Sequence, residues 1–176
     1  MPDIEICPLD AGCSVYVKLV ASGMRETLME VLGEQRGREM YTLDWLHERV
    51  CWHLDASRSC AVVLLAMDRH RDEKANHAED VFGHTIVRVE QDDDGQTFGL
   101  FSTTFVVPVL RRIGLAARLL DAGEAWIRAQ GLTRAATDTS QTNTKLIHLF
   151  ETRGYVVEFQ SEEMLRLSKS LVGVET

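Results

Sequence analysis

The residues best suited to chemistry lie in one run of the sequence, Phe105-Val-Val-Pro-Val-Leu-Arg-Arg-Ile-Gly-Leu-Ala116. Its β-branched beginning is typical of a strand; we expect this strand to end at Pro108 and a helix to begin near Gly114. The first N–H groups of a helix have no acceptor within it and lie at the positive end of its dipole. Arg111 and Arg112 add positive charge, and the small residues let a ligand approach the backbone. The run therefore predicts a site for a pyrophosphate.

The elements that must position this run alternate between strands and helices. By apolar spacing and turn residues, strands are expected at residues 4–8, 60–67, 83–90, 97–107, 134–139, 155–159 and 164–168, and helices at 15–32, 42–54, 114–131 and 143–154. Residues 33–39 are interpreted as a polar connection and residues 69–80 as a loop. This alternation predicts an α/β (α+β) fold with a mixed sheet and helices on both faces. The length fits a single domain over residues 1–176.

Composition narrows the classes of partner. The formal net charge of -8 argues against a nucleic-acid binder, whose affinity depends on Lys and Arg at phosphates. The longest apolar run, residues 60–67, is far shorter than the roughly 20 residues that cross a bilayer, and no secretory leader is visible. The 4 cysteines form no C-x-x-C pair, and the acidic turn at residues 92–94 lacks the rest of a calcium loop. We expect a cytoplasmic protein that binds no metal, no nucleic acid and no membrane.

The run that ends at Ala116 resembles the cofactor motif of the GNAT superfamily of acetyl-CoA-dependent N-acetyltransferases, Q/R-x-x-G-x-G/A. Arg111, Gly114 and Ala116 stand at its fixed positions. A second run, which begins at Asn143 and ends at Gly154-Tyr155, is similar to the N…LY…GF element of the same family. The two motifs stand in register on a compatible order of elements, over residues 83–167.

The resemblance implies a GNAT-type, mostly antiparallel sheet of six to seven strands, splayed between the fourth and fifth strands, with acetyl-CoA as the acetyl donor. The pantetheine arm would lie in the splay, and the pyrophosphate would meet the backbone amides at the start of the helix. The cofactor-binding residues that the resemblance implies are Phe105, Val106, Val107, Arg111, Arg112, Ile113, Gly114, Leu115, Ala116 and Asn143. Asn143 is also expected to cap its helix, and the two roles can coexist because an amide has donors and an acceptor.

The catalytic groups are not defined by the resemblance, because the sequence departs from the family pattern at two points. Phe150 stands where family members often have a tyrosine acid, and residues 99–105 hold no acidic residue to act as a base. A thiolate with a solution pKa of about 8.5 can leave without an acid. Tyr155 is expected either to replace the acid or to pack against the final strand. Glu90, Asp138 or a water chain remain as candidate bases, so no catalytic residue is assigned.

These features predict transfer of the acetyl group to a primary amine of a small molecule, by direct attack on the thioester. Residues 136–140 followed by Asn143 are similar to a stretch of aminoglycoside 6′-N-acetyltransferases, but amino acids and polyamines are equally open as acceptors. Two alternatives stand beside this function: acetylation of a protein N-terminus or lysine, and acyl-CoA binding without turnover. A homodimer is expected by analogy only. Trp45 and Trp52 are expected either on the core face of the second helix or in the wall of an acceptor pocket.

Overall fold

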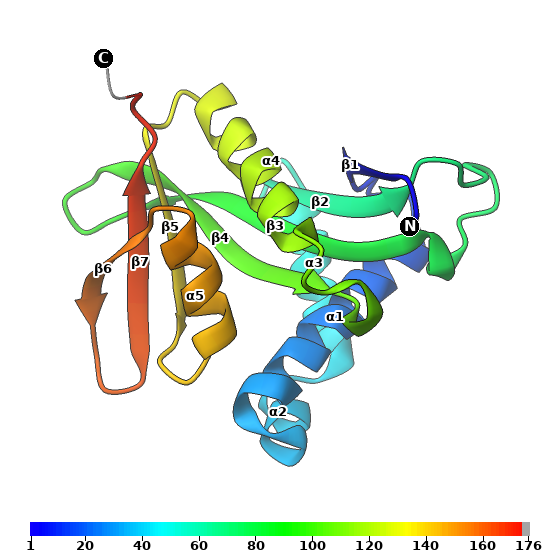
Figure 1. Cartoon of the computed structure of the whole chain (residues 1–176), viewed down its shortest axis with the longest axis horizontal. Coiled ribbons are helices and arrows are strands. Elements are labelled where there is room, and N and C mark those ends of the chain that lie inside the picture. Colours follow the sequence, from blue (N-terminus) through cyan, green and yellow to red (C-terminus); the bar gives the residue numbers. More distant parts are fainter. Residues whose placement is uncertain (174–176) are drawn as a thin grey trace.

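The computed structural model describes residues 1–173, which form a seven-stranded sheet and five α-helices (Figure 1). The strands are β1 Ile4–Pro8, β2 Ala61–Asp68, β3 Val81–Gln91, β4 Thr97–Val106, β5 Arg134–Ser140, β6 Val156–Gln160 and β7 Met164–Ser170. The helices are α1 Ser14–Leu32, α2 Glu34–Met40, α3 Leu43–Leu54, α4 Leu115–Ala129 and α5 Thr144–Thr152, with short 3-10 turns η1 Ala78–Asp80 and η2 Pro108–Leu110.

The sheet runs in the order β1-β2-β3-β4-β5-β7-β6. Each neighbouring pair of these strands is antiparallel except β4 and β5, which run parallel. The mixed, mostly antiparallel sheet is therefore confirmed, and its one parallel contact joins an antiparallel half of four strands to an antiparallel half of three.

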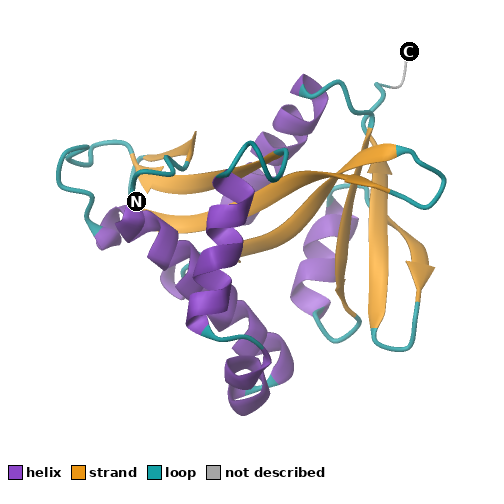
Figure 2. Cartoon of the chain, turned by 180° about the vertical axis from the view of Figure 1, so that it is seen from behind, coloured by secondary structure: helices purple, strands orange, loops and turns teal. Residues whose placement is uncertain are grey.

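Helices cover both faces of the sheet (Figure 2). Ile86 and Val87 are neighbours on β3, so their side chains point to opposite faces. Ile86 packs in a cluster with α1 and α3, whereas Val87 packs in a cluster with α4 and α5. The buried helical members are Tyr16, Val17, Val20, Ala21, Leu46 and Val50 on the first face and Leu120, Ile127 and Phe150 on the second. Within residues 1–173, no helix has the length and apolar character needed to span a membrane.

Glycines bring α4 very close to β4. A Cβ atom on Gly123 of α4 would lie 2.3 Å from Cε1 of Phe101, and a Cβ on Gly99 of β4 would lie 2.3 Å from Cγ1 of Ile127. Such distances leave no room for a side chain at either glycine. The far end of β4 is reached by the start of α4, where Leu115 and Leu119 pack in one cluster with Val106.

Two features of the helices differ from the sequence-based expectation. Residues 33–39 were interpreted as a polar connection, but most of them belong to α2 (Glu34–Met40). This helix packs on α1 so closely that a Cβ on Gly37 would lie 2.4 Å from the backbone nitrogen of Met29. Trp45 is not in the core: it is 45% exposed and stacks on Tyr41 with ring centroids 4.2 Å apart. The core face of α3 is formed by Leu46 and Val50 instead.

Two buried histidines make the stability of the fold depend on pH. His53 and His84 are each 2% exposed, and among residues 1–173 the Nε2 atom of each has no hydrogen-bond partner. Burial lowers the pKa of His53 to about 4 and the pKa of His84 to about 3. The folded protein therefore keeps both imidazoles neutral well below the ordinary histidine pKa of 6.5.

The free energy of unfolding is expected to fall as the pH is lowered from about 7 to about 5. In this window the unfolded chain takes up protons at both histidines and the folded protein does not, which costs up to about 1.4 kcal/mol per pH unit for each. Urea denaturation at pH 7, 6 and 5 measures the slope, and His84→Leu should reduce it by about half. Equal stability at all three pH values would contradict the prediction.

Candidate functional site

The site begins where β4 and β5 separate. Their parallel pairing covers Gly99 opposite Ala135, Leu100 opposite Ala136 and Phe101 opposite Thr137. Beyond Phe101, β4 stays paired with β3 as far as Val106, and Figure 1 shows it bending away from β5.

The bend coincides with an irregularity in the β3–β4 ladder. Ile86 pairs with Thr103 whereas Val87 pairs with Phe101, so Ser102 is an extra residue on β4. Extra residues of this kind bend a strand and increase its twist. Arg88 of β3 donates from Nη1 to the Ser102 hydroxyl at 2.8 Å, which holds the irregularity in place.

Only part of the outer end of β4 turns its backbone groups towards the gap. The N–H of Val107 donates to the Phe82 carbonyl oxygen at 2.9 Å, so it is already used by β3. Backbone groups alternate in direction along a strand, so those of Phe105 also face β3, whereas those of Thr104 and Val106 face the gap. Of the predicted cofactor-binding residues Phe105, Val106 and Val107, only Val106 turns its backbone groups towards the gap. Thr104, which was not predicted, has the same orientation.

The loop after β4 presents a row of free amides. η2 ends at Leu110, Arg112 and Gly114 adopt positive φ values of 65° and 82°, and α4 begins at Leu115. The first amide bonded within the helix is that of Arg118, which donates to the Gly114 carbonyl oxygen at 3.1 Å. Within residues 1–173, the amides of residues 112–117 have no main-chain or side-chain acceptor. Free amides at the start of a helix form a site for an anion.

Gly114 keeps the approach to these amides open. A Cβ atom at this position would meet no atom within 4 Å, so the space in front of it is empty. The first turn of α4 also carries no acidic residue and no side-chain cap. The residues present therefore fit a pyrophosphate, which needs donors, a positive dipole end and room.

The two arginines of the loop have different surroundings. Arg111 donates from Nε to the Val106 carbonyl oxygen at 2.8 Å, and its Nη2 lies 2.7 Å from Oε1 of Glu30 on α1. The side chain of Arg112 is exposed. The charge of Arg111 is therefore already balanced within the protein, and Arg112 is the arginine whose charge is available beside the amides.

Asn143 lies at the junction of β5 and α5, on the opposite wall of the gap from the loop. Its Oδ1 accepts from the N–H of Leu146 at 3.4 Å, and its Nδ2 donates to the hydroxyl of Thr139 at 3.2 Å. The predicted helix cap is confirmed. The second Nδ2 hydrogen and the second Oδ1 lone pair remain for a ligand.

Both carboxylates considered as a catalytic base are held by arginines. Asp138 accepts from Nε and Nη2 of Arg166 at 2.6 and 2.7 Å, and Glu90 is paired with Arg88. Charge-assisted pairs of this kind are among the stronger hydrogen bonds in proteins. Both carboxylates therefore already have a charged partner within the protein.

Phe150, which stands where family members often have a tyrosine acid, and Tyr155, the candidate replacement, are both parts of the core. Phe150 is fully buried between Phe101 and Tyr155, with ring centroids 5.5 and 4.8 Å away. The Tyr155 hydroxyl donates to Oε1 of Glu124 at 2.9 Å, and burial together with the Glu124 charge raises the pKa of Tyr155 well above its ordinary value. Lys169 completes this buried group with a 3.0 Å bond to the same oxygen. Tyr155 thus packs against the final strand and does not point into the gap.

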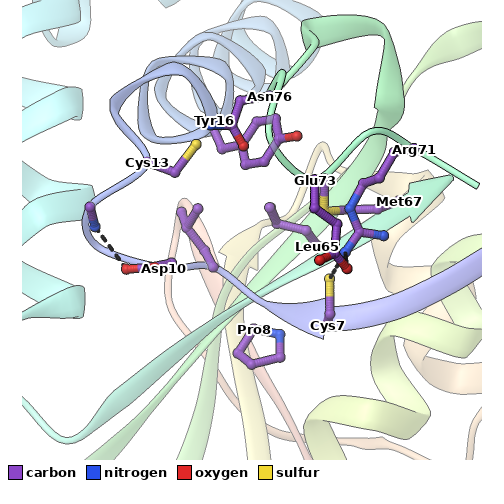
Figure 3. Close-up of a pocket in the computed structure, with 12 residues that line it drawn as sticks. Cys7, Pro8, Asp10, Cys13, Tyr16, Leu65, Met67, Arg71, Glu73 and Asn76 are labelled. Carbon is purple, nitrogen blue, oxygen red and sulfur yellow. Dashed lines mark hydrogen bonds and ion pairs between the residues drawn. The ribbon is translucent and has the colours of Figure 1, made fainter. Parts of the chain in front are cut away.

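A cavity of about 460 Å³ lies elsewhere, at the N-terminal end of α1 (Figure 3). Cys7, Cys13 and Tyr16 line it, and Arg71 across it is already paired with Glu5. Tyr16 and Glu30 are 14 positions apart on α1, which corresponds to roughly 21 Å along the helix. The cavity is therefore separate from the gap between β4 and β5.

The sequence and the fold of this chain are similar to those of known proteins. The model of the acetyltransferase (GNAT) family matches residues 22–155. No curated protein sequence matches the chain. Among solved structures, the chain is similar to PaiA N-acetyltransferase from Thermoplasma acidophilum in complex with coenzyme A, with a TM-score of 0.70 and 15% identity over 96% of this chain and 99% of that one.

Two further solved structures have the same fold. An acetyltransferase from Thermus thermophilus gives a TM-score of 0.69 and 11% identity over 97% of this chain and 100% of that one. Aminoglycoside 6′-acetyltransferase type Ii gives 0.67 and 13% identity over 97% of this chain and 99% of that one.

The match to the family model over residues 22–155 places the protein among the acyltransferases. The chain belongs to the acetyltransferase (GNAT) family, whose members are N-acetyltransferases that use acetyl-CoA.

Sequence reasoning missed two participants in this site. Thr104 directly precedes residues 105–116, the run that contains the cofactor motif. The direction of its backbone groups depends on the extra residue at Ser102. Glu30 lies 81 residues before Arg111 and belongs to no motif, so no signal in the sequence joined the two.

Proposed function

We propose that this chain transfers the acetyl group of acetyl-CoA to a primary amine of a small molecule, by direct attack of the amine on the thioester. The observation that carries the proposal is the row of unbonded amides at residues 112–117, beside a strand whose outer half has left its neighbour. The amides of Ile113, Gly114, Leu115 and Ala116 would hold the pyrophosphate. Arg112 would add countercharge from the surface.

The gap between β4 and β5 would receive the pantetheine arm. Thr104 would offer it both of its backbone groups, and Val106 would offer its N–H, because the Val106 carbonyl oxygen already accepts from Arg111. Phe105 and Val107 would contact it without a backbone hydrogen bond. Asn143 would contact it from the wall formed by β5 and α5, using the hydrogen and the lone pair left free by its cap. Pairing of this kind orients the ligand along the strand and so aligns the acetyl group for attack.

A thioester is an activated acyl donor, so the main task of the protein is to bring a neutral amine to it in the right orientation. Proximity and orientation lower such a barrier by about 7–11 kcal/mol. The N–H of Val106 would polarise the thioester oxygen. Because Glu90 and Asp138 are each paired with an arginine, a chain of water molecules is the base that best fits the site for the proton of the ammonium group.

Release of free CoA thiol measures this reaction directly. The protein is expected to release thiol from acetyl-CoA when small primary amines are added, with amino acids, polyamines and aminoglycosides in the panel. A matched panel of peptides with free N-termini and lysines tests the protein-acetylating alternative. Turnover with peptides alone would overturn the small-molecule proposal, and tight CoA binding without turnover on either panel would overturn the proposed reaction.

A further inference from the structure

The side chain of Arg111 connects the proposed cofactor loop to two other elements of the molecule. Its Nη1 and Nη2 atoms contact Oε2 and Oε1 of Glu30 at 3.2 and 2.7 Å, and its Nε donates to the Val106 carbonyl oxygen at 2.8 Å. The guanidinium carbon also lies 5.6 Å from the ring centroid of Phe105. One side chain thus joins α1, the outer end of β4 and the loop that presents the amides.

The loop needs such a connection because its backbone is strained. Arg112 follows Arg111 directly and has a φ of 65°, a left-handed conformation that costs a residue with a Cβ atom about 1–2 kcal/mol. Strained conformations persist only where their surroundings hold them. Exposed Arg112 and Ile113 contribute little burial to do so. The three side-chain bonds of Arg111 hold the residue directly before the strained one.

We propose that Glu30 is a positioning residue for the cofactor loop. It acts through Arg111, which it holds across the end of β4, so that the amides of residues 112–117 keep the arrangement that receives phosphate. The binding role of those amides rests on the proposed function; the holding of the loop does not. The amides would contact the phosphates, and the Arg111 side chain would hold the loop that carries them. Through Glu30, α1 becomes part of the cofactor site.

Glu30→Ala tests this assignment. The matched control is Glu26→Ala, which removes the same charge from a position one turn earlier on α1. The first measurement is the rate at which trypsin cleaves after Arg111 and Arg112 in the ligand-free protein. Glu30→Ala should raise this rate several-fold and Glu26→Ala should not, because only the former releases the loop. This measurement needs no ligand.

The second measurement is CoA affinity by calorimetry, with acetyl-CoA kinetics. For Glu30→Ala we expect the Kd of CoA and the KM of acetyl-CoA to rise about fivefold, the upper range for a partly exposed ion pair, with kcat little changed. Arg111→Lys keeps the charge but loses the two-pronged contact, and should weaken binding to a similar extent. The double variant should bind no more weakly than either single variant, since both act on one contact.

The outcomes separate the inference from the function on which it rests. If trypsin cleaves Glu30→Ala faster than the wild type but the wild type fails to bind CoA, the role of Glu30 in holding the loop is supported and the proposed function is overturned. Wild-type CoA binding with unchanged cleavage and unchanged affinity in Glu30→Ala would overturn the role of Glu30 and leave the function standing. Additive losses in the double variant, or full affinity in Arg111→Lys, would show that Glu30 does not act through the geometry of Arg111.

Discussion

Replacing Gly114 by glutamate is expected to weaken CoA binding by about 100-fold or more while leaving the protein folded. The new side chain would project into the empty space in front of the free amides and place a negative charge where the phosphates would bind. The φ of 82° at Gly114 adds a strain of about 1–2 kcal/mol, which is small against the stability of a domain. Calorimetric titration with CoA measures the loss.

Gly131→Glu is the matched control. Gly131 follows the other end of α4, has a φ of 77°, and a Cβ atom there would also meet nothing within 4 Å. The substitution therefore introduces the same charge and similar strain far from the amides. CoA affinity close to that of the wild type is expected for Gly131→Glu. Equal affinities of the two variants, whether both lost or both retained, would refute a phosphate site at Gly114.

Gly123→Val is expected to reduce the free energy of unfolding by about 3 kcal/mol or more, because it overpacks the contact between α4 and β4. The added Cβ would lie 2.3 Å from Cε1 of Phe101, which is itself buried against Phe150 and has no free direction in which to move. CoA affinity should fall as well, since this contact holds α4, whose first turn carries free amides, beside β4.

Ala125→Val provides the comparison for Gly123→Val. Ala125 lies on the exposed side of the same helix, so valine there changes helix propensity without entering the core. Urea denaturation of both variants should give a loss below about 1 kcal/mol for Ala125→Val. Similar losses for the two variants would mean that α4 does not pack on β4 as closely as the structure describes.

The sequence was sufficient to predict the features of the candidate site that depend on local backbone chemistry. The free amides follow from a helix start with no acidic cap, and Gly114 marks the left-handed residue before it. The cap at Asn143 and the helix stop near Gly131 also depend on residues close in sequence. Such features are set by a few neighbours, so the sequence could predict them.

The features that escaped prediction depend on contacts between distant segments. α2 has no apolar stripe, and the close approach of Gly37 to the backbone of α1 shows how it is accommodated. Trp45 has helical spacing from Trp52, yet its partner is Tyr41 outside α3 and it stays exposed. The pairing of Arg111 with Glu30 belongs to the same group. No rule of local spacing identifies partners of this kind.

The parting of β4 from β5 has a consequence for how the family can vary. A gap between two strands exposes backbone N–H and C=O groups to a ligand, much as the edge of a sheet exposes them to an added strand. A ligand bound through backbone groups would depend little on which side chains the strand carries. The proposed binding mode would therefore tolerate wide sequence variation, and this chain shares its fold with a structure that is only 15% identical over 96% of it.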